Sequence, residues 1–229
     1  MIPVILHVLC EGQTEDRFAN NVLKAYLKNY NIIVKTTILV TNKKKNSKGG
    51  MLSYTQVKND LKLLFKQHAK KTSETHYYTT MFDLYALPDD FPGYSETKKI
   101  FDCYRKVEKL EQRFANEINL HPFIPYIQLH EFEALVFCGL EHLLIDYPDM
   151  EKQVKNLQEI VLQYANNPEK INDNPETAPS KRIIKEFESK HHYNKPKSGV
   201  FVTDKVSIEG LKSKCPHFKE WIEKLENLK

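Results

Sequence analysis

Residues 4–12 of the chain are VILHVLCEG, an apolar run that ends in an acidic residue and a glycine. Such a run, interrupted only by His7, predicts a strand that is buried on both faces. The glycine permits a tight turn, so we expect Glu11 at the end of the strand. Apolar residues then recur at helical spacing, with Thr14 as the expected N-cap of a helix. The segment therefore predicts a strand–turn–helix unit.

The same alternation continues along the chain. Residues 32–40, 77–84 and 123–129 are further predicted strands, and Pro125 places the last of them at an edge or at a bulge. Helices are expected from Ser53 and, as one long amphipathic helix, from Ser95 to about residue 118. Strands and helices in alternation predict an α/β fold, with a mostly parallel sheet flanked by helices.

The pattern changes near residue 141, which suggests the domain organisation. Residues 150–164, 179–187 and 217–228 have helical spacing without intervening strands. We therefore expect an α/β domain over residues 1–140 and a C-terminal helical appendage over residues 141–229 packed on it. One continuous domain is the alternative.

Composition limits the classes of protein to consider. The chain has 229 residues, 41% of them hydrophobic, which is enough for one sizeable core. No apolar run approaches the roughly 20 residues that cross a bilayer, and the first residues lack the features of a signal peptide. Four widely separated cysteines favour a reducing, cytoplasmic location over a disulfide framework. The net charge of +4 permits a nucleic-acid partner without requiring one.

Carboxylates follow three of the four predicted strands. They are Glu11 and Glu15 after the first strand, Asp83 at the end of the third, and Glu131 and Glu133 after the fourth. Because the carboxyl ends of parallel strands meet at one edge of a sheet, we expect these side chains to gather there. Clustered carboxylates repel one another and require a cation or shared protons. Their hard oxygen atoms suit Mg²⁺ or Mn²⁺, as in phosphodiester cleavage.

Other interpretations remain open for individual residues. Glu15 and Glu133 are equally compatible with a helix-start role, and Arg17 is a possible ion-pair partner for one carboxylate. His130 is a candidate metal ligand or general base, or a histidine at a helix start whose hydrogen bonds are satisfied there. Asp83 lies within an apolar run, where an unpaired charge is costly, so a partner or a metal is expected.

Basic residues near this edge are candidates for phosphate binding. Lys43 and Lys44 lie in a polar loop after the second strand, and Lys181 and Arg182 follow Pro179-Ser180 at a predicted helix start. The alternatives are a solubilising loop for the first pair and an ion pair with Glu176 for the second.

Several motifs in order resemble the family called domain of unknown function 4276. They are E-G-x-T-E at 11–15, M-F-D-x-Y-x-L-P at 81–88, I-x-L-H-E-F-E-A-L at 127–135, N-D-N-P-E-T-A-P-S-K-R-I at 172–183 and C-P-H-F-x-x-W at 215–221. That family is regarded as related to Toprim domains, so the resemblance implies a Toprim-like fold with Glu11 as a metal-associated glutamate. The Toprim D-x-D motif is incomplete, because Tyr85 replaces its second aspartate.

The resemblance implies two functions. The first is a Mg²⁺-dependent nuclease or other phosphodiester-processing effector, in which Glu11, Asp83 and His130 are catalytic. Members of the family are typically encoded beside an ABC-type ATPase, as in bacterial defence modules. The second is therefore a catalytically silent partner or regulator of such an ATPase, which the missing aspartate favours.

Overall fold

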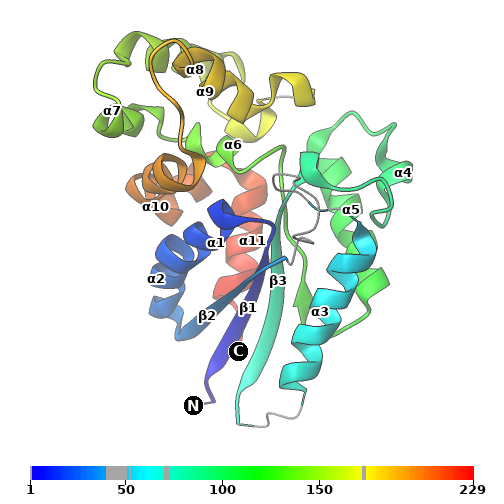
Figure 1. The fold of residues 1–229 in the computed structure, drawn as a ribbon. Coiled ribbons are helices and arrows are strands. Elements are labelled where there is room, and N and C mark those ends of the chain that lie inside the picture. Colours follow the sequence, from blue (N-terminus) through cyan, green and yellow to red (C-terminus); the bar gives the residue numbers. More distant parts are fainter. Residues whose placement is uncertain (1, 40–50, 52, 70–72, 172–173) are drawn as a thin grey trace.

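The fold is built on a parallel sheet, seen in a computed structural model that describes residues 2–39, 51, 53–69, 73–171 and 174–229 (Figure 1). Its five strands are β1 (Val4–Cys10), β2 (Ile32–Ile38), β3 (Thr75–Asp83), β4 (Phe123–Ile124) and β5 (Ile127–Gln128). The order is β2-β1-β3-β4, and β5 also pairs with β3. All these pairings are parallel, which confirms the predicted α/β fold with helices flanking a mostly parallel sheet.

The buried first strand occupies the middle of the sheet. Val4 pairs with Ile32 on one side and with Thr75 on the other. Cys10 is the last residue of β1 to pair with either neighbouring strand. Strands β1, β2 and β3 therefore end at the same edge. The predicted fourth strand is divided at Pro125, since proline has no N–H for a ladder. The next amide, Tyr126 N, donates to the Thr80 hydroxyl at 3.0 Å instead.

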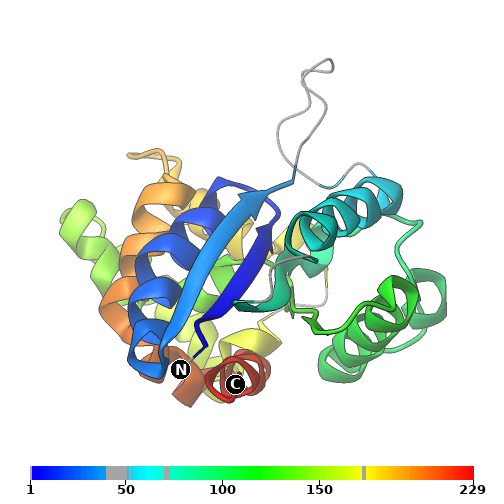
Figure 2. The ribbon, with the colours of Figure 1, turned by 90° about the horizontal axis from the view of Figure 1, so that it is seen from below.

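Helices cover both faces of the sheet (Figure 2). One face carries α1 (Gln13–Phe18), α2 (Lys24–Leu27), α10 (Val200–Lys214) and α11 (Pro216–Glu226), and the other carries α3 (Tyr54–His68) and α5 (Cys103–Ile118). The elements α6 (Glu133–Val136), α7 (Leu143–Asp146), α8 (Glu151–Gln163) and α9 (Pro179–Phe187) lie beyond the carboxyl ends of the strands. Among the described helices, none has the length and apolar character to cross a membrane.

The C-terminal helices share a hydrophobic core with the sheet. Leu6 and Val8 of β1 belong to the same buried cluster as Phe18 of α1, Trp221 of α11 and Phe187 of α9. A second cluster lies between the opposite face of the sheet and α3 and α5. Residues after 141 are thus packed directly on the sheet.

Two local expectations were wrong, and one helix was not predicted. The helix predicted from Ser95 is two elements, α4 (Tyr94–Thr97) and α5, because Asp102 begins a new helix by accepting the Arg105 amide at 2.8 Å. Gly12, and not Thr14, is the N-cap of α1. Helix α10 escaped the pattern analysis, and Ser207 interrupts it with a φ of 68°.

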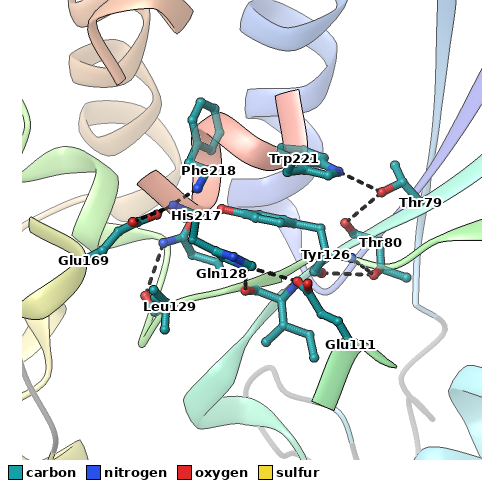
Figure 3. A network of polar contacts seen from close by, with 11 residues as sticks. Thr79, Thr80, Glu111, Tyr126, Gln128, Leu129, Glu169, His217, Phe218 and Trp221 are labelled. Atoms are coloured by element: carbon teal, nitrogen blue, oxygen red, sulfur yellow. Dashed lines mark hydrogen bonds and ion pairs between the residues drawn. The ribbon is translucent and has the colours of Figure 1, made fainter. Parts of the chain in front are cut away.

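A buried polar network, the anchor network, holds α11 against the rest of the molecule (Figure 3). Glu169, which is fully buried, accepts the backbone amides of His217 and Phe218, both at 2.9 Å. These amides belong to the first turn of α11, where N–H groups lack partners within the helix. Trp221 Nε1, one turn later, donates to the Thr79 hydroxyl at 2.9 Å. The carboxylate therefore supplies the helix cap that local sequence lacks.

The same network reaches α5 and the edge of the sheet. His217 Nε2 lies 3.1 Å from Glu111 Oε1 and 3.2 Å from the carbonyl oxygen of Ile127. Tyr104 of α5 donates its hydroxyl to Glu169 at 3.2 Å. Burial raises the pKa of Glu169, and the amides of α11 oppose that rise. Its carboxylate oxygens both have donors.

Candidate acidic metal centre

The five predicted carboxylates come from two strand ends and two helix starts. Glu11 follows β1, Asp83 ends β3, Glu15 lies in α1, and Glu131 and Glu133 lie at the start of α6. We call this group the acidic edge. It forms at the carboxyl ends of the strands, where ligands bind in open α/β sheets.

Glu11 and Asp83 are joined directly through the backbone. Glu11 Oε2 accepts the amide of Asp83 at 3.0 Å, and the Glu11 amide donates to the carbonyl oxygen of Met81 at 3.2 Å. Neighbouring parallel strands thus place the two acidic residues side by side, as the sequence predicted.

Carboxylates of the acidic edge lie close enough together to raise the pKa of Glu11 and of Asp83. Burial raises the pKa of Glu11 from 4.5 to about 7, with Glu15 and Glu131 adding to the rise. The pKa of Asp83 is raised well above its usual value by burial and then by Glu15, Glu11, Glu133 and Glu131. Repulsion of this kind means that these carboxylates lie in one region, where they disfavour the ionised forms of Glu11 and Asp83.

Two carboxylate oxygens at the acidic edge are buried without a hydrogen-bond partner. They are Asp83 Oδ1 and Glu133 Oε1. The Glu133 side chain is only 1% exposed, and burial raises its pKa to about 7. An unsatisfied buried polar atom is costly and calls for a ligand or a proton. These two oxygens are where a cation would relieve the cost.

Glu15 and Glu131 also have structural roles. Glu15 Oε2 accepts the Gly12 amide at 2.9 Å, so it completes the start of α1. Glu131 Oε2 accepts the Ser180 amide at 3.0 Å, in the first turn of α9. The helix-start interpretation therefore holds for Glu15, whereas Glu131 supports a helix that lies far away in the sequence.

Lys195 is a residue of this site that sequence reasoning missed. It begins the π-helical turn Lys195–Gly199, and its Nζ lies 3.2 Å from Glu133 Oε2. Glu133, Glu131 and Asp83 raise the pKa of Lys195 against the effect of its burial. The Asn-Lys-Pro sequence at 194–196 indicates a helix start. No local signal places it beside Glu133, because 62 positions separate the two residues.

The other predicted residues have separate contacts. His130 Nε2 lies 3.0 Å from the carbonyl oxygen of Glu169, and Lys181 pairs with Glu176 at 3.3 Å. Arg182 Nε donates to the carbonyl oxygen of Thr177 at 2.8 Å. The pair formed by Lys181 is the alternative that the sequence left open.

Two further predictions concern basic residues. Arg17, the possible ion-pair partner, donates to the carbonyl oxygen of Pro196 at 3.4 Å. Lys43 and Lys44 lie outside the described residues.

The donor set fits a hard cation. Mg²⁺ takes one or two protein carboxylates and retains water, so Glu11, Asp83 and Glu133 have the right chemistry. The acidic edge does not, however, hold three donor atoms in close contact. Within the described ranges, only His7, His68 and His76 place three donors within 4.8 Å of one another.

Comparison with known proteins supports the family resemblance and goes no further. A search of curated proteins and a search of solved structures each found no match. The profile of one protein family, described as "Domain of unknown function (DUF4276)", matches residues 10–226, which is nearly the whole chain and includes every residue of the acidic edge. The chain therefore belongs to the DUF4276 family.

Proposed function

We propose that the protein is a Mg²⁺- or Mn²⁺-dependent phosphodiesterase acting on nucleic acid, with its active site at the acidic edge. The observation that carries this proposal is the pair of buried, unpartnered oxygens on Asp83 and Glu133 among other carboxylates. A fold alone would gain stability from apolar residues at these positions. Buried carboxylate oxygens without a hydrogen-bond partner therefore favour a ligand at this edge.

Each residue has a defined part in this proposal. Glu11 and Asp83 would hold the ion, and Glu133 would assist them. When bound, the ion supplies an activated water and neutralises charge on the phosphoryl group. The amide of Asp83 fixes the orientation of the Glu11 carboxylate. Lys195, protonated and 37% exposed, offers a positive charge to a phosphate beside Glu133.

The test is cleavage of labelled single- and double-stranded DNA and RNA by purified protein with Mg²⁺ or Mn²⁺. We expect Glu11→Gln and Asp83→Asn each to reduce cleavage by at least about a hundredfold, the scale of a lost electrostatic contribution. Glu176→Gln is the control, because the Glu176 side chain is 82% exposed. Cleavage that is unchanged in both site variants would exclude this active site.

A second candidate function is a silent partner of an ABC-type ATPase, as in a bacterial defence module. Two observations favour it: Tyr85 replaces the second aspartate of D-x-D, and Lys195 already pairs with Glu133. A silent module would show no Mg²⁺-linked rise in melting temperature, whereas an ion-binding site would. Copurification with the neighbouring ATPase, unaffected by Asp83→Asn, would support the silent function.

A further inference from the structure

Three histidines meet at the opposite end of the sheet from the acidic edge. His7 lies within β1, His76 near the start of β3, and His68 in the last turn of α3. β1 and β3 pair in register, with His7 opposite Tyr78 and Ile5 opposite His76. Helix α3 ends beside the start of β3 (Figure 1). The fold thus brings together residues that are 69 positions apart in the chain.

The rings of this histidine cluster are in direct contact. His7 Nε2 lies 3.0 Å from His76 Nδ1, and the His7 and His68 ring centroids are 4.1 Å apart. Three ring nitrogens, one from each residue, lie within 4.8 Å of one another. His7 is 4% exposed, so its ring has little access to bulk water.

Acceptor groups lie beside the outer nitrogen atoms of two rings. His68 Nδ1 lies 2.8 Å from the carbonyl oxygen of Leu64, which can only accept, so Nδ1 carries the proton and Nε2 keeps its lone pair. His76 Nε2 lies 3.2 Å from a carboxylate oxygen of Glu74, and its Nδ1 faces His7 Nε2. A histidine that ligates a metal almost always donates its other N–H to a carbonyl or carboxylate in this way.

We propose that His7, His68 and His76 form a binding site for a divalent transition-metal ion such as Zn²⁺. Imidazole nitrogen suits Zn²⁺ and its neighbours in the series, whereas Mg²⁺ prefers oxygen. Zn–N bonds of about 2.0–2.1 Å place tetrahedral donors about 3.3 Å apart. The His7–His76 pair is already that close, and the donor atoms of all three residues lie within 4.8 Å of one another. A pocket of about 770 Å³ lined by His68, Glu74 and His76 gives an ion access from solvent.

The proposal is independent of the acidic edge. The two groups of residues lie at opposite ends of the strands and prefer different metals. The chain offers one competing thiol pair, Cys138 and Cys215, whose buried sulfur atoms are 3.3 Å apart. The experiment must therefore separate imidazole from thiolate ligation.

The test is a competition titration of metal-stripped, full-length protein with Zn²⁺ and a chromogenic chelator. We expect one equivalent to bind, and expect His68→Gln and His76→Gln each to weaken binding by more than tenfold. Glu74→Gln should weaken it about tenfold, as loss of an outer partner does. His192→Gln is the matched control because its side chain is exposed. His68 is only partly buried, so His68→Gln is expected to fold, which thermal unfolding checks.

Three outcomes would overturn the proposal. They are the absence of stoichiometric Zn²⁺ binding, equal affinity in the wild type and both histidine variants, and binding that is lost in Cys138→Ser instead. Substitution with Co²⁺ adds a spectroscopic check, since sulfur ligands give intense charge-transfer bands that nitrogen ligands lack. Asp83→Asn should leave Zn²⁺ affinity unchanged, which keeps this result separate from any failure of the proposed phosphodiesterase.

Discussion

The anchor network and the acidic edge both bury carboxylates, and they differ in how these are satisfied. In the anchor network, the Glu169 oxygens accept two helix amides and a tyrosine hydroxyl. At the acidic edge, Asp83 Oδ1 and Glu133 Oε1 have no hydrogen-bond partner, and burial raises the pKa of both residues, with neighbouring carboxylates adding to the rise. The difference teaches that burial of an acid is not by itself a sign of function. The balance of donors and acceptors separates a satisfied structural acid from one that has room for a ligand.

The largest expected effect is the loss of the anchor. Glu169→Ala should lower the free energy of unfolding by about 3–6 kcal/mol, because two buried amides lose a charged partner worth about 1.5–3 kcal/mol each. Urea denaturation measures this change. Glu176→Ala, at an exposed position, should change stability by less than about 0.5 kcal/mol. A loss below about 1 kcal/mol in Glu169→Ala would contradict a structural role for this acid.

The next effect concerns pH and the acidic edge. The folded-state pKa of Glu133 is raised from 4.5 to about 7, so its protonated form is favoured in the fold. This stabilisation is fully present below pH 4.5 and is lost as the pH rises to about 7, a change of about 3 kcal/mol.

The pH dependence must be separated from other groups. The pKa of His217 is also raised above its usual value of 6.5. His217 therefore also contributes a loss of stability as the pH rises. The measurement is therefore the difference in unfolding free energy between the wild type and Glu133→Gln, followed from pH 4.5 to 8 in metal-free buffer. We expect the wild type to lose stability relative to the variant across this interval. A constant difference would show that Glu133 ionises normally.

A third substitution should raise the free energy of unfolding, whereas Glu169→Ala should lower it. Asp83→Asn removes a charge that burial and neighbouring carboxylates oppose, so the free energy of unfolding of metal-free protein at pH 8 should rise. If the proposed site binds Mg²⁺, saturating Mg²⁺ should reverse the order, since the ion would stabilise the wild type alone. Destabilisation of the metal-free variant would place Asp83 with the structural acids.

The smallest expected effect concerns the ion pair between Lys195 and Glu133. Lys195→Gln leaves Glu133 without its ion pair and should lower metal-free stability at pH 8 by about 1 kcal/mol, a modest value because Lys195 is 37% exposed. Lys197→Gln is the matched control two positions along, where the pair with Asp146 is on the surface. Equal changes in stability in both variants would show that Lys195 has no special role at the acidic edge.

The sequence predicted much of the fold because the signals were local. The apolar run of β1, the alternation of strands and helices, and the break at Pro125 each depend on neighbouring residues. The division of the helix predicted from Ser95 was missed, because apolar spacing continued across residues 98–102 while Asp102 supplied a cap. The local pattern of residues does not reveal whether the apolar spacing or the Asp102 cap decides where the helix begins.

The candidate site was predictable only in part, for the same physical reason. Glu11 and Asp83 meet because parallel strands end together, and that rule can be applied to a sequence. Lys195, and the helix amide that Glu131 caps, arrive from far along the chain through tertiary packing. The histidine cluster was missed because its members lie on β1, α3 and β3 with no recognisable spacing.

The most direct test of the account is Mn²⁺ binding followed by electron paramagnetic resonance at pH 7.5, where carboxylates with a pKa of about 7 are mostly ionised. We predict one bound ion per chain in the wild type, none in Glu11→Gln or Asp83→Asn, and unchanged binding in Glu176→Gln and His68→Gln. Binding that persists in Glu11→Gln and Asp83→Asn, or no binding in the wild type, would contradict the claim that the unpartnered acids form a metal site.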